Sequence, residues 1–108
     1  MSENLEEKPA QRLRIYINDS DRWHEQPLSS ALLDLMRARG LAGATLFRGL
    51  AGYGAHSLIH SNRLEALSMD LPVVVETVDS AEAISTLLEA ISPMLPDEDR
   101  AVVDYELI

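Results

Sequence analysis

The sequence predicts an α+β fold in which two helices cover one face of a four-stranded antiparallel sheet. Three observations lead to this prediction. Four short segments have the apolar patterns of strands, and apolar residues recur at helical spacing in two others. These segments follow one another as strand, helix, strand, strand, helix, strand. The chain has 108 residues, which is the length of one domain, so all six segments belong to one packed unit.

The first strand begins at Arg12. Alternate residues from Leu13 to Ile17 are aliphatic, and the residues between them are charged or aromatic, which is typical of a strand with one buried face. The strand ends at residues 18–21, an Asn-Asp-Ser-Asp run that favours a turn. Residues 1–11 are polar and acidic, and we expect a disordered leader there, followed by a single domain over residues 12–108.

The first helix is predicted to start at Pro27, because a proline in the first turn loses no hydrogen bond. Gly40 ends it. Its apolar stripe consists of Leu28, Ala31, Leu32, Leu35 and Met36. Trp23, the single tryptophan, precedes this helix in a charged turn; it could stack on a flat ligand, but packing against the end of the core is the favoured interpretation.

The remaining elements repeat this arrangement. Residues 44–50 are the second strand, and residues 71–78 are the third, which is β-branched on both faces and therefore central. Ser80 caps a second helix, which ends before Pro93. Residues 102–107 alternate again and form the last strand. The apolar stripe of the second helix consists of Ile84, Leu87, Leu88 and Ile91.

This order of elements is that of two split βαβ units, which make a ferredoxin-like βαββαβ sandwich. Both helices lie on one face of the sheet, so they cannot cover the other. Because the third strand is apolar on both sides, the open face would be a hydrophobic patch in a monomer. Patches of this kind mark interfaces, and the sequence therefore predicts a homo-oligomer.

The composition excludes several classes of protein. The chain is 46% apolar and 25% charged, as in soluble globular domains, and its lack of cysteine excludes disulfides and thiolate ligands. A net charge of −9 argues against unspecific binding of nucleic acid. Residues 12–63 nevertheless carry seven arginines and four acids, so an anion site is expected in that half. Without a signal peptide or a long apolar stretch, a cytoplasmic protein is expected.

The connection between the second and third strands, residues 51–70, is longer than a hairpin requires. Three glycines stand around its start, where successive backbone N–H groups could form a nest for an anion. A bulge where the hairpin leaves the sheet is the alternative. The candidate ligand-binding residues here are Arg48, Gly49, Gly52, Tyr53, Gly54, His60 and Arg63.

The same connection contains the residue types of two other functions. His56 and His60 have a spacing that can chelate a metal, although they supply only half of a tetrahedral site, and hydrogen bonding is their favoured role. Ser57, His60 and Asp70 are the residue types of a hydrolytic triad, but no strand-turn-helix elbow surrounds the serine. No enzyme is therefore predicted, no cofactor follows from these residues, and a metal-binding trimer remains the alternative.

Four stretches of the chain carry a family resemblance: LRIYINDSDRWH at 13–24, GATLFRGLAGYG at 43–54, IH at 59–60 and DLPVVVETVD at 70–79. Together they resemble the family called domain of unknown function 190, and the resemblance extends from Leu13 to Leu107. That family is similar in fold to the PII signalling proteins, which are ferredoxin-like homotrimers. The resemblance therefore implies a homotrimer.

In PII proteins the long connection after the second strand is the T-loop, which responds to the nucleotide bound between subunits and docks onto transporters or enzymes. By resemblance, residues 51–70 are its counterpart, and the glycines at its base lie where PII backbone groups meet a phosphate. The resemblance implies a regulatory protein that senses a small ligand, with an adenine nucleotide as the candidate. Ion transporters associated with the family, fluoride exporters included, suggest a membrane transporter as partner.

One departure from the PII pattern bears on the ligand. PII proteins also hold phosphate with a loop that contains glycines and a lysine, between the second helix and the last strand. Residues 92–100 here contain neither, and they include three consecutive acids, Asp97, Glu98 and Asp99. Unless Arg100 or a metal offsets them, these carboxylates would repel a triphosphate in a cleft of low dielectric. A ligand with fewer charges is therefore expected.

Overall fold

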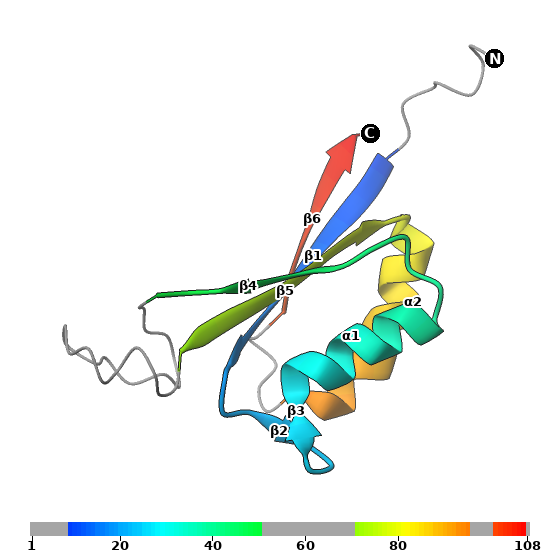
Figure 1. Ribbon diagram of the computed structural model, residues 1–108. Helices are drawn as coiled ribbons and strands as arrows, with labels where there is room; N and C mark the ends of the chain where they lie inside the picture. The colour runs from blue at the N-terminus through cyan, green and yellow to red at the C-terminus, as the bar shows by residue number, and fades with distance from the viewer. Residues whose placement is uncertain (1–8, 51–70, 96–100, 108) are drawn as a thin grey trace.

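The computed structural model describes residues 9–50, 71–95 and 101–107. Four of its strands form one antiparallel sheet in the order β4-β5-β1-β6, and both helices pack on the same face of it (Figure 1). This arrangement confirms the predicted ferredoxin-like sandwich, with β5 and β1 in its centre. The strands of this sheet and the helices are β1 (Pro9–Asn18), α1 (Leu28–Ala38), β4 (Thr45–Arg48), β5 (Pro72–Asp79), α2 (Ala81–Ile91) and β6 (Ala101–Leu107).

The core lies between the sheet and the two helices. Leu13, Ile15 and Ile17 of β1 are at most 2% exposed, as their alternation predicted. Burial of each such side chain favours folding by roughly 1.5–3 kcal/mol. The helices contribute the predicted stripes, of which Leu35 and Leu88 are only partly buried. The buried members of these stripes are Leu28, Ala31, Leu32, Met36, Ile84, Leu87 and Ile91.

The ends of the helices follow the local signals. The Ser80 hydroxyl accepts a hydrogen bond from the Ala83 N–H at 3.1 Å, which confirms the predicted cap of α2. Gly40 has φ +79° just beyond α1, a conformation that glycine adopts without strain. Pro27 is the N-cap residue of α1 rather than part of its first turn. After Ile91 the chain continues as a short 3-10 turn, η3 (Ser92–Met94), which contains Pro93.

β1 starts earlier than the sequence pattern indicated. Its first three residues, 9–11, lie in the segment expected to be a leader, and they pair with β6 in the register Pro9↔Leu107, Ala10↔Glu106 and Gln11↔Tyr105. The partner strand lies at the other end of the chain, so no local pattern reveals this pairing. The boundary of the folded domain therefore moves from residue 12 to residue 9, and residues 1–8 lie outside the described part.

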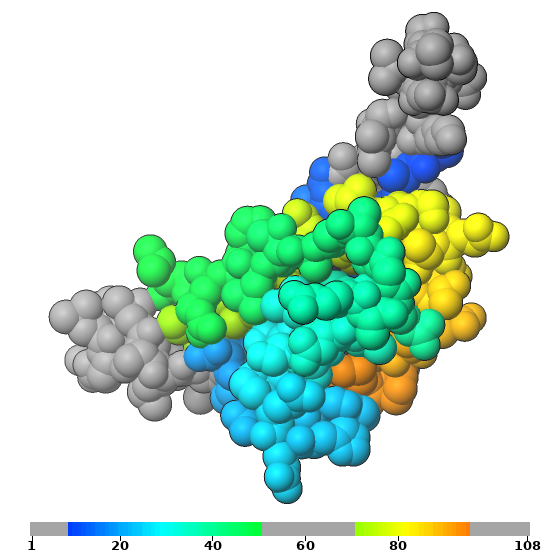
Figure 2. All heavy atoms as spheres, turned by 45° about the vertical axis from the view of Figure 1, so that its right-hand side comes forward, coloured from blue at the N-terminus to red at the C-terminus, as the bar shows by residue number. Residues whose placement is uncertain are grey.

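A small hairpin between β1 and α1 was not predicted. Its strands are β2 (Arg22–Trp23) and β3 (Gln26–Pro27), and it projects from the lower end of the molecule (Figure 2). The two turn residues, His24 and Glu25, have φ of 50° and 70°, the primed turn geometry that two-residue hairpins prefer. Trp23 packs against the core, which confirms its predicted packing role.

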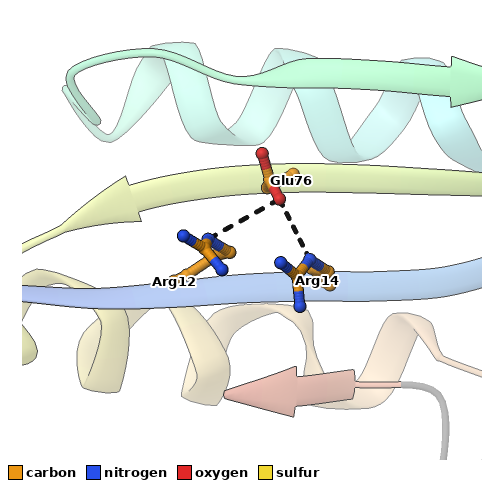
Figure 3. A network of polar contacts seen from close by, with 3 residues as sticks. All are labelled: Arg12, Arg14 and Glu76. Carbon is orange, nitrogen blue, oxygen red and sulfur yellow. Dashed lines mark hydrogen bonds and ion pairs between the residues drawn. The ribbon is translucent and has the colours of Figure 1, made fainter. Parts of the chain in front are cut away.

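The face of the sheet opposite the helices is less apolar than predicted. Val74 lies between Phe47 and Tyr16 in the strand register, and these two aromatic side chains are 51% and 43% exposed. Beside this row, Glu76 forms ion pairs with Arg12 at 3.8 Å and Arg14 at 3.0 Å (Figure 3). The predicted apolar face is thus an apolar row next to a charged cluster, because Glu76 interrupts the outward-facing valines of β5.

Candidate functional site

The two ends of the connection between β4 and β5 are held close together. The Gly49 N–H donates to the Pro72 carbonyl oxygen at 2.8 Å, which closes the connection directly after β4. The Asp19 N–H donates to the Leu71 carbonyl oxygen, also at 2.8 Å. The turn after β1 therefore lies against the residue at which the connection returns to the sheet.

Arg48, a predicted ligand-binding residue, forms an ion pair with Asp19. Its Nη1 lies 2.6 Å from Asp19 Oδ1, and the two side chains are 49% and 36% exposed. Arg48 is the last residue of β4, whereas Asp19 belongs to the turn between β1 and β2. The ion pair therefore joins two segments that both meet the start of β5.

The turn that carries Asp19 has its own hydrogen bonds. The Asn18 N–H donates to Asp21 Oδ2 at 2.9 Å, as the Asn-Asp-Ser-Asp run predicted for a turn. The backbone oxygen of Asp21 accepts from the Leu28 N–H at the start of α1, at 2.8 Å. These bonds fix the position from which Asp19 reaches Arg48.

Gly49 has a structural role that differs from the predicted anion nest. Its N–H already donates to Pro72, so it does not point at a ligand. A Cβ atom at this position would lie 2.8 Å from Pro72 Cγ, and the absence of a side chain is what permits this close approach. The other predicted site residues, Gly52, Tyr53, Gly54, His60 and Arg63, lie outside the described residues, as do His56, Ser57, Asp70 and Asp97–Asp99.

Two surface hollows of about 390 Å³ each lie near the C-terminal end of α1. One reaches from Arg39 to the first turns of α2, and the other lies between α1 and residues 41–44. Neither contains a residue that the sequence indicated as a ligand contact. Among the side chains of residues 9–50 and 71–95, no three of the metal-ligating types gather into a possible metal site. The helices of these ranges lack the length and hydrophobicity of a membrane span.

The family model DUF190, described as "Uncharacterized ACR", matches residues 10–105. The chain belongs to this family. A UPF0166 protein of Aquifex aeolicus (strain VF5) is 42% identical over 79 residues, which are 73% of this chain and 75% of the relative. A UPF0166 protein of Methanocaldococcus jannaschii is 26% identical over 94 residues, 87% of this chain and 86% of the relative.

Solved structures of PII-like proteins share the fold of this DUF190 protein. CPII from Thiomonas intermedia K12, in a structure bound to ADP and bicarbonate, is 22% identical with a TM-score of 0.62, covering 95% of this chain and 89% of CPII. A PII-like signalling protein from Thermus thermophilus is 18% identical with a TM-score of 0.57, covering 94% of this chain and 89% of that protein. At these low identities the likeness concerns the fold, which is PII-like.

The sequence did not reveal Asp19 as the partner of Arg48. The sequence predicts only a turn around Asp19, and nothing local distinguishes this residue from Asp21, two positions later. The one available signal was the resemblance, because both residues stand in the stretches that carry it. The pairing itself depends on the sheet bringing the end of β4 near the end of β1.

Proposed function

We propose that this protein is a homotrimeric PII-like regulatory protein that binds an adenine nucleotide between subunits. The observation that carries the proposal is the PII-like fold, which extends over 95% of the chain. CPII, the similar protein of Thiomonas intermedia K12, has been solved with ADP, AMP and bicarbonate. A PII-like signalling protein from Thermus thermophilus has the same fold, which supports a regulatory role for this chain.

The open face of the sheet supports assembly. Tyr16, Val74 and Phe47 form an apolar row on it, and two exposed aromatic rings beside a valine would remain in water in a monomer. The neighbouring cluster of Arg12, Arg14 and Glu76 adds charges that fix which parts of two copies can meet. We therefore assign this face to the contact between subunits, and the ligand to the clefts that assembly creates.

Arg48 supports an anionic ligand at the base of the connection. Its side chain is half exposed, and the planar set of donors of its guanidinium suits a phosphate as well as a carboxylate. We expect Gly52, Tyr53, Gly54, His60 and Arg63 to complete the site. Because residues 97–99 are acidic, AMP or ADP is expected to bind more tightly than ATP.

The connection of residues 51–70 is proposed to carry the signal. The described residues on either side of it, Gly49 and Pro72, are hydrogen-bonded to each other next to Arg48, so a ligand held by Arg48 would lie at the base of the connection. The partner that we propose for this segment is a membrane transporter that the cytoplasmic trimer regulates. A pull-down from solubilised membranes with and without nucleotide, compared with a variant lacking residues 55–66, tests this part.

Isothermal titration tests the ligand. Purified protein is titrated with AMP, ADP, ATP and cyclic AMP, and sedimentation velocity measures the mass of the particle at micromolar concentration. The proposal expects a trimer that binds at least AMP or ADP. Absence of binding across the four nucleotides would exclude the nucleotide, and a stable monomer would exclude clefts between subunits.

A further inference from the structure

Three contacts hold the start and the end of the connection between β4 and β5. Two of them join backbone atoms: the Gly49 N–H to the Pro72 oxygen and the Asp19 N–H to the Leu71 oxygen, each at 2.8 Å. The third joins side chains, Arg48 to Asp19 at 2.6 Å. The backbone contacts continue the β4–β5 and β1–β5 strand pairings by one residue each. The side-chain contact, by contrast, can be replaced without breaking a hydrogen bond of the sheet.

We propose that Asp19 is an internal anion that occupies Arg48 in the absence of ligand and that a phosphate group of the ligand replaces it. This inference rests on the proposed nucleotide binding and adds a step of regulation to it. Arginine pairs equally well in geometry with a carboxylate and with a phosphate, and a phosphate carries the higher charge. An ion pair between exposed side chains adds little to stability, so little opposes the exchange.

Replacement of Asp19 by a phosphate would also affect the turn after β1 and the β2–β3 hairpin, although the phosphate does not contact them. Asp19 stands in the turn whose Asp21 accepts a hydrogen bond from the first residue of α1. The same turn leads into the β2–β3 hairpin, where Trp23 packs against the core. Release of Asp19 removes the side-chain link between this turn and β4. Binding of the phosphate to Arg48 thereby changes the constraint on the β2–β3 hairpin. By thermodynamic linkage, the conformation of this turn also changes the affinity for the ligand.

The affinity for ADP tests this competition. In Asp19→Asn the competing charge is lost, while asparagine keeps the size and the turn preference of the residue. We expect this variant to bind ADP about two- to fivefold more tightly than the wild type, the range that an exposed ion pair covers. The matched control is Asp34→Asn, which removes the same charge from an exposed position on α1 and should leave the affinity unchanged.

A second pair of variants shows whether the effect passes through Arg48. Arg48→Gln should weaken ADP binding, and adding Asp19→Asn to it should then change nothing further. Trp23, the single tryptophan, provides an independent signal: its emission should change on saturation with ADP in the wild type and change less in Asp19→Asn.

The outcomes separate the two proposals. If the wild type binds no adenine nucleotide, the proposed function and the exchange are both wrong. If the wild type binds ADP but Asp19→Asn and Asp34→Asn shift the affinity equally, only the exchange is wrong. A gain from Asp19→Asn that persists in the Arg48→Gln background would also overturn it, because the effect would then be one of net charge.

Discussion

Glu76 of β5 accepts a hydrogen bond from Arg14 of β1 at 3.0 Å, and the same carboxylate oxygen lies 3.8 Å from Arg12. The carboxylate of Glu76 thus forms ion pairs with two arginines on the open face of the sheet (Figure 3). Glu76→Gln removes the shared charge, and we expect it to lower the free energy of unfolding by about 1 kcal/mol. Urea unfolding measures this, with the exposed Glu89→Gln of α2 as the control; equal losses in both variants would contradict a specific role of the cluster.

Phe47 tests the proposed contact between subunits. Because its ring is 51% exposed beside Val74, Phe47→Lys should leave the fold intact but place a charge in the apolar row. We expect dissociation to smaller species, measured by sedimentation velocity. Ala38→Lys adds the same charge on α1, at an exposed position on the opposite side of the sheet, and should keep the assembly. An unchanged particle mass in Phe47→Lys would remove this face from the interface.

Gly49 and Gly43 form a matched pair for stability. A Cβ at Gly49 would lie 2.8 Å from the rigid ring of Pro72, whereas a Cβ at Gly43 has nothing within 4 Å. Gly49→Ala should therefore destabilise the protein by about 1–3 kcal/mol, and Gly43→Ala should be neutral or slightly stabilising. Chemical denaturation of both variants measures the difference. Similar stabilities would show that Pro72 adjusts to the added methyl group.

The β2–β3 turn offers a stabilising change. His24 and Glu25 both have positive φ, which asparagine and glycine adopt more readily. The double substitution His24→Asn and Glu25→Gly should raise the free energy of unfolding by about 0.5–1 kcal/mol. Thermal and urea unfolding test this expectation. A loss of stability would mean that the edge-to-face contact of His24 with Trp23, whose ring centroids lie 4.3 Å apart, outweighs the backbone strain.

Local periodicity was sufficient for the elements that bury one face. The alternation from Leu13 to Ile17 and the stripes of both helices predicted the core, and Ser80 predicted the start of α2, because each signal lies within a few residues of the feature that it specifies. The β2–β3 hairpin was missed because its turn lacks the glycine or asparagine that normally marks one.

Contacts between distant segments could not be predicted in the same way. Arg12 and Arg14 were recognised as the outward side of β1, but their carboxylate partner stands in β5, 62 positions after Arg14. The pairing of Arg48 with Asp19 likewise depends on the order of the strands. Of the predicted site, only Arg48 and Gly49 lie in the described residues, where Gly49 proved to be a packing position and Arg48 an ion-pairing one.

The hydrogen bond between Gly49 and Pro72 also bears on how this architecture can diverge. Since the bond already closes the hairpin, the sheet does not depend on how many residues intervene, and doubling their number costs only about 0.6 kcal/mol of closure entropy. The connection between β4 and β5 can therefore differ in length and sequence between homologues. Such changes would alter what the connection binds without altering the sheet.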